Sequence, residues 1–171
     1  MEGRIIDVKG QKLYIEHNNQ LRDRPTIVFL HDSLGSVQLW RDFPAKLAEI
    51  TQCNTLAYDR LGYGKSFPML THERPIHYME LEADLLNDVL TEMNIDNVVL
   101  FGHSDGGTIA LITAAKYPER IKAVICEAGH IFVEETTLKG VYDAWEAYKT
   151  TNLPERLQKY HGDKVEMLFR A

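Results

Sequence analysis

Five residues near the middle of the chain, Gly102-His103-Ser104-Asp105-Gly106, have the types and spacing that nucleophilic catalysis needs. The apolar segment Asn97–Phe101 before them predicts a buried strand, and Thr108–Lys116 after them predicts a helix of small residues. A tight bend between strand and helix would strain the Ser104 backbone and lift its hydroxyl clear of the sheet. The free N–H groups at the start of that helix favour an anion. We therefore expect Ser104 to be the nucleophile and the N–H of Asp105 to hold an oxyanion.

A second polar segment, His31-Asp32-Ser33-Leu34-Gly35, follows the apolar run Thr26–Leu30. In a parallel sheet this loop lies at the same edge as Ser104, because both follow the carboxyl ends of strands that run in one direction. Active sites of open α/β sheets lie at that edge. The N–H of Ser33 is expected to complete the oxyanion hole. An ordinary strand-to-helix connection is the alternative interpretation of the loop. Three further side chains are expected to contact substrate: His31, Asp32 and His103.

The elements that must position these residues alternate between strand and helix. A hairpin around Gly10, formed by Arg4–Val8 and Lys12–His17, comes first. Buried strands are then predicted at Thr26–Leu30, Asn54–Tyr58, Asn97–Phe101 and Ala123–Cys126. Helices are predicted between and after them at Trp40–Ile50, Tyr78–Met93 and Thr108–Lys116. This order predicts an α/β fold with a mostly parallel sheet and helices on both faces.

The chain changes character after Gly129. Three helical patterns follow, at Leu138–Tyr148, Leu153–Tyr160 and from Lys164 to the end, and no apolar strand returns. We expect a core over residues 1–132 and a helical cap segment over residues 133–171. Three aromatic residues could line an apolar pocket under the cap, although an ordinary core position is the favoured interpretation: Trp40, Tyr142 and Trp145.

Composition excludes several classes of function. The chain has 171 residues, with 19 basic and 25 acidic side chains and a net charge of -6, so a nucleic-acid or membrane-surface partner is not expected. The two cysteines, Cys53 and Cys126, form neither a disulfide framework nor a zinc pattern. No apolar run approaches the ~20 residues that span a bilayer. These features predict a cytoplasmic protein without a zinc site of cysteines.

Taken together and in this order, the motifs resemble the α/β-hydrolase superfamily. The matching segments are the His31-Asp32 loop, Asp59-Arg60-Leu61-Gly62-Tyr63-Gly64-Lys65-Ser66, the Gly102–Gly107 bend and Ala114–Arg120. The resemblance implies a serine hydrolase that cleaves an ester or a related bond of a small-molecule substrate through Ser104, and it implies no metal or other cofactor. Asp32 departs from the pattern, since the family usually has glycine there.

The resemblance also implies a triad in the chain order serine, acid, histidine. The acid and the histidine normally follow later strands, and no later strand is predicted here. We therefore expect a chain truncated at its C-terminus, with the last strands and the catalytic histidine missing. Glu127, at the end of a predicted strand, is a candidate acid by resemblance to haloalkane dehalogenases. Only His130 and His161 follow Ser104; neither is expected to be the base, and His161 is expected to be solvated.

Two other interpretations remain open. Relatives of this superfamily that have lost their triads serve as receptors or interaction modules, so the chain could be an inactive binding protein or an inactive fragment. A shortened sheet would also leave an unpaired edge and an uncovered apolar face. Association into a homo-oligomer, or with a missing C-terminal fragment, is expected on that ground.

Overall fold

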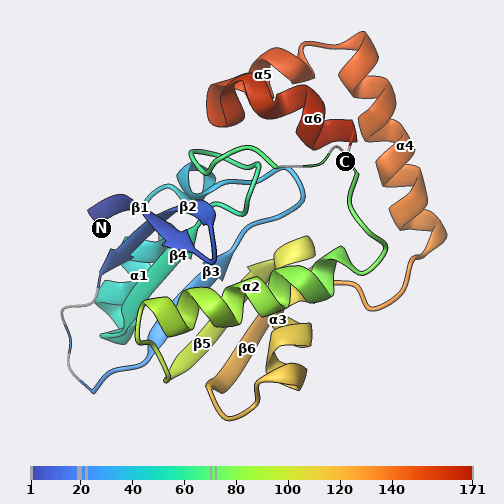
Figure 1. Cartoon of the computed structure of the whole chain (residues 1–171). Helices are drawn as coiled ribbons and strands as arrows, with labels where there is room; N and C mark the ends of the chain where they lie inside the picture. Colours follow the sequence, from blue (N-terminus) through green and yellow to red (C-terminus); the bar gives the residue numbers. More distant parts are fainter. Residues whose placement is uncertain (1, 19–20, 22, 70, 72, 171) are drawn as a thin grey trace.

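The computed structural model describes residues 2–18, 21, 23–69, 71 and 73–170. Its centre is a six-stranded sheet in the order β1-β2-β4-β3-β5-β6 (Figure 1). The strands are β1 (Glu2–Val8), β2 (Gln11–Asn18), β3 (Thr26–Leu30), β4 (Asn54–Tyr58), β5 (Val98–His103) and β6 (Ile121–Glu127). The four strands β4, β3, β5 and β6 are parallel, whereas β1 and β2 are antiparallel to their neighbours. The predicted fold class and the N-terminal hairpin are confirmed.

Helices cover both faces of the sheet. They are α1 (Phe43–Thr51), α2 (Tyr78–Glu92) and α3 (Asp105–Lys116), with a short 3-10 turn, η1 (Val37–Trp40), before α1. Three more helices follow the sheet: α4 (Glu135–Thr150), α5 (Leu153–His161) and α6 (Val165–Arg170), with a 3-10 turn, η2 (Gly162–Lys164), between the last two. The single helix predicted over Trp40–Ile50 is instead η1 followed by α1, which has Pro44 in its first turn.

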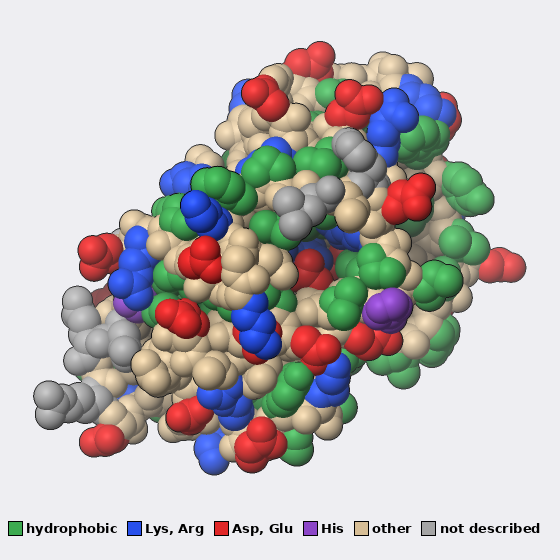
Figure 2. All heavy atoms as spheres, in the orientation of Figure 1, with side chains coloured by type: hydrophobic (Ala, Val, Ile, Leu, Met, Phe, Trp, Pro, Cys, Tyr) green, Lys and Arg blue, Asp and Glu red, His purple; other side chains and the backbone are tan. Residues whose placement is uncertain are grey.

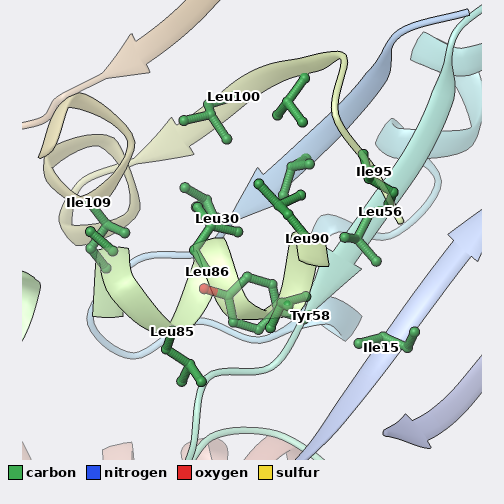
Figure 3. Close-up of a cluster of buried hydrophobic side chains, with 14 of the residues drawn as sticks. Ile15, Leu30, Leu56, Tyr58, Leu85, Leu86, Leu90, Ile95, Leu100 and Ile109 are labelled. Carbon is green, nitrogen blue, oxygen red and sulfur yellow. The ribbon is translucent and has the colours of Figure 1, made fainter. Parts of the chain in front are cut away.

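The core is divided by the sheet because successive side chains of a strand point to opposite faces. In β3, Val28 and Leu30 join the larger apolar cluster, while Ile27 and Phe29 join the smaller one. Helices α2 and α3 close the larger cluster with Leu86, Leu90 and Ile109 among others (Figure 3). Trp40 is partly buried and packs against the smaller cluster, edge-on to Phe29 at 5.4 Å between ring centroids. This packing favours the predicted structural role of Trp40 at the border of the core.

Strand β6 forms one edge of the sheet and pairs only with β5 among the described residues. Its apolar residue Ile125 is 45% exposed, and Cys126 is exposed as well. Helices α4, α5 and α6 lie apart from the sheet, above the carboxyl ends of its parallel strands (Figure 1). The expected division into a core and a helical cap segment stays a prediction, although α4 starts close to the expected boundary.

Two glycines around the bend after β5 let α3 pack directly on β3 and β5. A Cβ atom at Gly106 would collide with the carbonyl oxygen of Leu30 in β3, and one at Gly102 would collide with the carbonyl oxygen of Gly106. Backbone atoms cannot swing aside as a flexible side chain can. The parallel register, with Leu30 opposite Gly102, therefore depends on the absence of side chains at these two positions.

Gly106→Ala is expected to destabilise the protein by about 3 kcal/mol or more, because the added methyl group overlaps backbone in a packed core. The free energy of unfolding in urea measures this. Gly140→Ala is the matched control: Gly140 lies within α4, and nothing lies within 4 Å of a Cβ atom placed there. That control is expected to stabilise by about 0.5–1 kcal/mol. Equal stabilities of Gly106→Ala and the unmodified protein would contradict the close packing.

Candidate active site

Ser104 occupies the bend between β5 and α3 in a strained backbone conformation. Its φ is 53° and its ψ is −120°, values that residues other than glycine rarely adopt. Two backbone hydrogen bonds hold it there: its N–H donates to the carbonyl of Glu127 at 2.8 Å, and its carbonyl accepts from the N–H of Thr108 at 3.1 Å. Such strain, of order 1–3 kcal/mol, persists only where the surroundings enforce it. The predicted sharp bend is present, with the serine at its apex.

Two backbone N–H groups beside Ser104 are free of partners among the described residues. Asp105 is the first residue of α3, so its N–H has no carbonyl one turn earlier to bond. In the loop after β3, the N–H of Leu34 donates to Asp32 Oδ1 at 3.0 Å and that of Gly35 donates to the Asp32 carbonyl at 3.2 Å. The N–H of Ser33 makes no such bond within the described part of the chain. Ser33 and Asp105 both line the same cavity as Ser104.

His31 is a buried support of this loop, with only 3% of its surface exposed. Its Nδ1–H donates to the Asp32 carbonyl at 2.8 Å, and its Nε2 accepts from the N–H of Arg60 at 3.2 Å. Burial, followed by the nearby charge of Arg60, holds the pKa of His31 well below its usual range. The ring is therefore neutral, with its proton on Nδ1. It does not line the cavity, so this geometry gives it a supporting position; its contact with substrate stays a prediction.

The other predicted polar residues lie at the rim of the sheet. His103 Nδ1 is 3.5 Å from Asp32 Oδ2, and both side chains are more than a third exposed. Glu127 is exposed, and its contribution to the bend is its backbone carbonyl, which accepts from Ser104. None of the three lines the cavity. Their predicted roles in substrate binding, and for Glu127 as the catalytic acid, stay predictions.

A cavity of about 990 Å³ separates the bend from the helical segment α4–α6. Ser33, Ser104 and Asp105 lie on its floor side, and α4 and α6 contribute an apolar wall that includes Val141, Trp145 and Phe169. Trp145 stacks on Phe169 at 5.8 Å between centroids. Hydrophobic side chains are visible along the right-hand side of the molecule in Figure 2. In α4, Val141 is 62% and Tyr142 is 68% exposed. The favoured interpretation of Tyr142 and Trp145 as core residues is wrong, because both line this cavity.

His161 joins the helical segment to the core. Its Nδ1 accepts from the N–H of Gly64 at 2.9 Å, and its Nε2–H donates to the carbonyl of Leu34 at 3.0 Å. The side chain is 2% exposed, so the expectation that it is solvated is wrong. Nearby, Lys164 Nζ donates to the carbonyls of Gly64 at 2.5 Å and Ser66 at 2.6 Å. These contacts fix the end of α5 and η2 against the Asp59–Ser66 loop.

No described histidine bonds the hydroxyl of Ser104. Both ring nitrogens of His161 are used by the backbone of the core loops. His130 lines the cavity, but its contacts with Thr108 run through its backbone N–H and carbonyl. Within the described residues, the Ser104 Oγ makes no hydrogen bond. The expectation that neither histidine after Ser104 is the base stays a prediction.

The described residues contain no group of three or more His, Cys, Asp or Glu side chains placed to bind a metal ion. In the same part of the chain, no helix is long and apolar enough to cross a membrane. Arg60 is buried beneath the site, and the sequence did not predict a role for it. Its segment, Asp59–Ser66, was recognised only as one of those that resemble the family. No local signal marks such a residue, because its burial depends on elements far away in sequence.

Residues 25–170 match the family model described as alpha/beta hydrolase fold. The chain belongs to this family. Among curated proteins, Serine hydrolase BPHL of Homo sapiens is 30% identical over 154 residues, or 87% of this chain and 51% of the relative. Epoxide hydrolase 1 of Caenorhabditis elegans is 26% identical over 186 residues, or 99% of this chain and 43% of the relative. The chain thus spans about half the length of these relatives.

Solved structures of similar fold agree with the architecture. A structure described with carboxylesterases of the Thaumarchaeon Nitrososphaera gargenis has a TM-score of 0.74 at 20% identity, covering 98% of this chain and 65% of the other. MGS-M2, an alpha/beta hydrolase enzyme from a deep-sea metagenome library, has a TM-score of 0.70 at 24% identity, covering 91% of this chain and 55% of the other. At these identities the likeness concerns the fold alone.

His161→Gln is expected to lower the free energy of unfolding at pH 7.5 by about 1–2 kcal/mol, because glutamine cannot satisfy both buried backbone groups. Burial lowers the pKa of His161 below that of the unfolded chain. The folded state thus binds fewer protons than the unfolded state, and this histidine's stabilisation is lost as the pH falls through its folded pKa. The difference between the two proteins is expected to shrink between pH 7.5 and pH 5. Urea unfolding at both pH values measures it.

His31, Asp59 and Lys164 are present in both proteins, so their own titrations cancel in this comparison to first order. A difference that stays constant from pH 7.5 to pH 5 would show that His161 titrates alike in the folded and unfolded chains. That result would contradict its buried, neutral position between Gly64 and Leu34.

Proposed function

We propose that this protein is a serine hydrolase that acts on an ester or a related bond, with Ser104 as the nucleophile. One observation carries the proposal: Ser104 sits in a strained bend that faces a cavity, beside two N–H groups that are free of partners among the described residues. The hydrolases among the relatives support the general class of reaction. The activity, substrate and partners of the whole protein are part of this proposal.

In the proposed reaction the Oγ of Ser104 attacks the carbonyl carbon of the ester. The carbonyl π-electrons move to oxygen, and the N–H groups of Asp105 and Ser33 stabilise the resulting oxyanion. Collapse breaks the ester C–O bond, the leaving alkoxide takes up from water the proton that Ser104 has released, and the alcohol departs. The acyl group stays on Ser104 until water hydrolyses it to a carboxylic acid and restores the serine hydroxyl. Removing one such N–H donor from a hydrolase typically costs about 10²–10³ in kcat, so these two amides are a large part of the proposed catalysis.

The proton of Ser104 needs an acceptor. We propose that this chain has no catalytic histidine of its own, since no described imidazole bonds Ser104 and both nitrogens of His161 are engaged. Glu127 remains the proposed acid. Oxyanion stabilisation and binding alone retain about 10³–10⁴-fold catalysis over water in serine enzymes that lack triad members. Slow acylation is therefore the activity proposed for the 171-residue chain.

The proposed substrate is a small molecule with an apolar portion. Val141, Trp145 and Phe169 present apolar surface across the cavity from Ser104. We further propose a cytoplasmic location, with which the free thiols of Cys53 and Cys126 agree, and no cofactor. The exposed edge strand β6 supports association with a second copy or a further fragment.

A binding protein without turnover is the second candidate. It is favoured by the absence of a hydrogen-bonded base at Ser104 within the described residues. Such a protein would use the same cavity and would not need the serine hydroxyl. The two candidates therefore predict different effects of Ser104→Ala. The hydrolase loses turnover, whereas the binding protein keeps its affinity for the ligand.

Treatment with a fluorophosphonate probe is expected to add one adduct, mapped to Ser104 by intact and peptide mass spectrometry. Ser104→Ala is expected to abolish labelling and to lower p-nitrophenyl butyrate hydrolysis below that of the unmodified protein, to the rate that the oxyanion hole and binding alone support. Thr150→Ala is the matched control, because it deletes an exposed hydroxyl on α4 that donates to the Glu146 carbonyl. It should leave both readouts unchanged.

A folded protein that forms no adduct and shows no difference between Ser104→Ala and the unmodified chain would reject the hydrolase. Retained binding of the ester by Ser104→Ala, without turnover in either protein, would favour the binding protein instead.

A further inference from the structure

The carbonyl oxygen of Asp32 is the most heavily bonded acceptor near the site. It accepts from Arg60 Nη2 at 2.7 Å, from His31 Nδ1 at 2.8 Å and from the N–H of Gly35 at 3.2 Å. Arg60 is 2% exposed, so its guanidinium approaches this carbonyl from inside the protein. The Asp32–Ser33 peptide is thereby held from one side.

Holding that carbonyl also sets the direction of the Ser33 N–H. A peptide unit is planar, and no peptide bond of the described chain is cis, so the C=O and the following N–H point in opposite directions. With the Asp32 oxygen turned toward Arg60, the N–H of Ser33 points away from the buried guanidinium. Ser33 lines the cavity on that other side. Rotation of this peptide would turn the N–H away from any substrate oxygen.

Arg60 Nη2, the nitrogen that bonds the Asp32 carbonyl, also lies near Asp105, the residue that carries the second free N–H group. Arg60 Nη2 is 3.7 Å from Oδ2 of Asp105, and that oxygen accepts from the Tyr78 hydroxyl at 3.2 Å. The Asp105 side chain is 7% exposed. The ring of Tyr63 packs against the guanidinium, with 4.5 Å from the guanidinium carbon to the ring centroid. One buried cation thus contacts both segments that carry the free N–H groups.

Stability alone does not explain this arginine. Its Nε and Nη1 are buried without a hydrogen-bond partner among the described residues, as are the Tyr58 hydroxyl and Glu82 Oε2. Burying a charge with incomplete hydrogen bonding costs free energy, and apolar replacements of buried ion pairs are often neutral or stabilising. The well-made contact of Arg60 is the one to Asp32.

We propose that Arg60 is a positioning residue that aligns the oxyanion hole, fixing the Ser33 N–H through the Asp32 carbonyl and the Asp105 N–H through its carboxylate. The inference rests on the proposed serine hydrolase. Arg60 itself does not line the cavity, so the proposed role needs no contact between its side chain and the ester. Its effect is on the transition state, where the oxyanion forms, and not on the binding of the ester.

Arg60→Lys tests this, because lysine keeps the charge, but its Nζ ends one bond short of the position of Arg60 Nη2, the nitrogen that contacts both Asp32 and Asp105. The variant is expected to lower kcat for p-nitrophenyl butyrate by about 10- to 100-fold, a part of the loss caused by deleting an oxyanion donor, with KM within about twofold. In the unliganded protein, the ¹⁵N–¹H resonances of Ser33 and Asp105 are expected to shift. Arg120→Lys is the matched control: Arg120 is bonded to Asn87 and Asp96 through side-chain contacts remote from the cavity, and is not among its lining residues.

Arg120→Lys is expected to keep kcat and both resonances, whatever it costs in stability. Unchanged kcat and unchanged resonances in folded Arg60→Lys would overturn the proposal, as would equal losses of kcat in the two variants. If Ser104→Ala hydrolyses the ester as fast as the unmodified protein, the hydrolase itself fails. The amide resonances need no turnover, so an unshifted Ser33 resonance rejects the alignment separately from that failure.

Discussion

The contact of α3 with the backbone of β3 and β5 is the constraint on which the site depends. It exists because Gly102 and Gly106 present no side chain between the bend and the Leu30 carbonyl. That contact forces the chain to turn within one residue after β5, and Ser104 takes the positive φ at the turn. It also brings the end of β3, with the loop that carries Ser33, beside the first N–H of α3. Packing of two glycines thus places the nucleophile and both N–H donors together.

The helical segment is attached to the core in a different way. The side chains of His161 and Lys164 bond the backbone of the Asp59–Ser66 loop and of Leu34, whereas the α4–α6 surface that faces the site is apolar. Directional hydrogen bonds fix where the segment sits, and the apolar wall leaves the cavity able to hold an apolar group. The position of the helical segment and the lining of the cavity are therefore set by different residues. A change at Trp145 or Phe169 alters the cavity wall without removing the hydrogen bonds that attach the segment to the core.

Much of the fold was predictable because it follows local pattern. Continuous apolar runs gave β3, β4 and β5, and the glycine spacing around Ser104 gave the bend. Residues such as His161 and Arg60 were not predictable in this way. His161 lies in a polar helical pattern and is buried only because Gly64 and Leu34, which are 97 and 127 residues away in sequence, receive it. Arg60 carries a charge, and its burial follows from contacts with Asp32 and Asp105. Which residues meet across such distances in sequence is decided only when the sheet has assembled.

The neutral state of His31 completes the electrostatics of the site. Its Nε2 accepts from the backbone N–H of Arg60 while its Nδ1–H donates to the Asp32 carbonyl, so one tautomer satisfies both bonds. Protonation would place a hydrogen on Nε2 facing that N–H, and burial and the Arg60 charge lower the pKa of His31 to prevent this. Arg60 therefore holds the Asp32 peptide twice, directly through its side chain and indirectly through His31. Because neither group changes charge near neutral pH, the direction of the Ser33 N–H stays constant there.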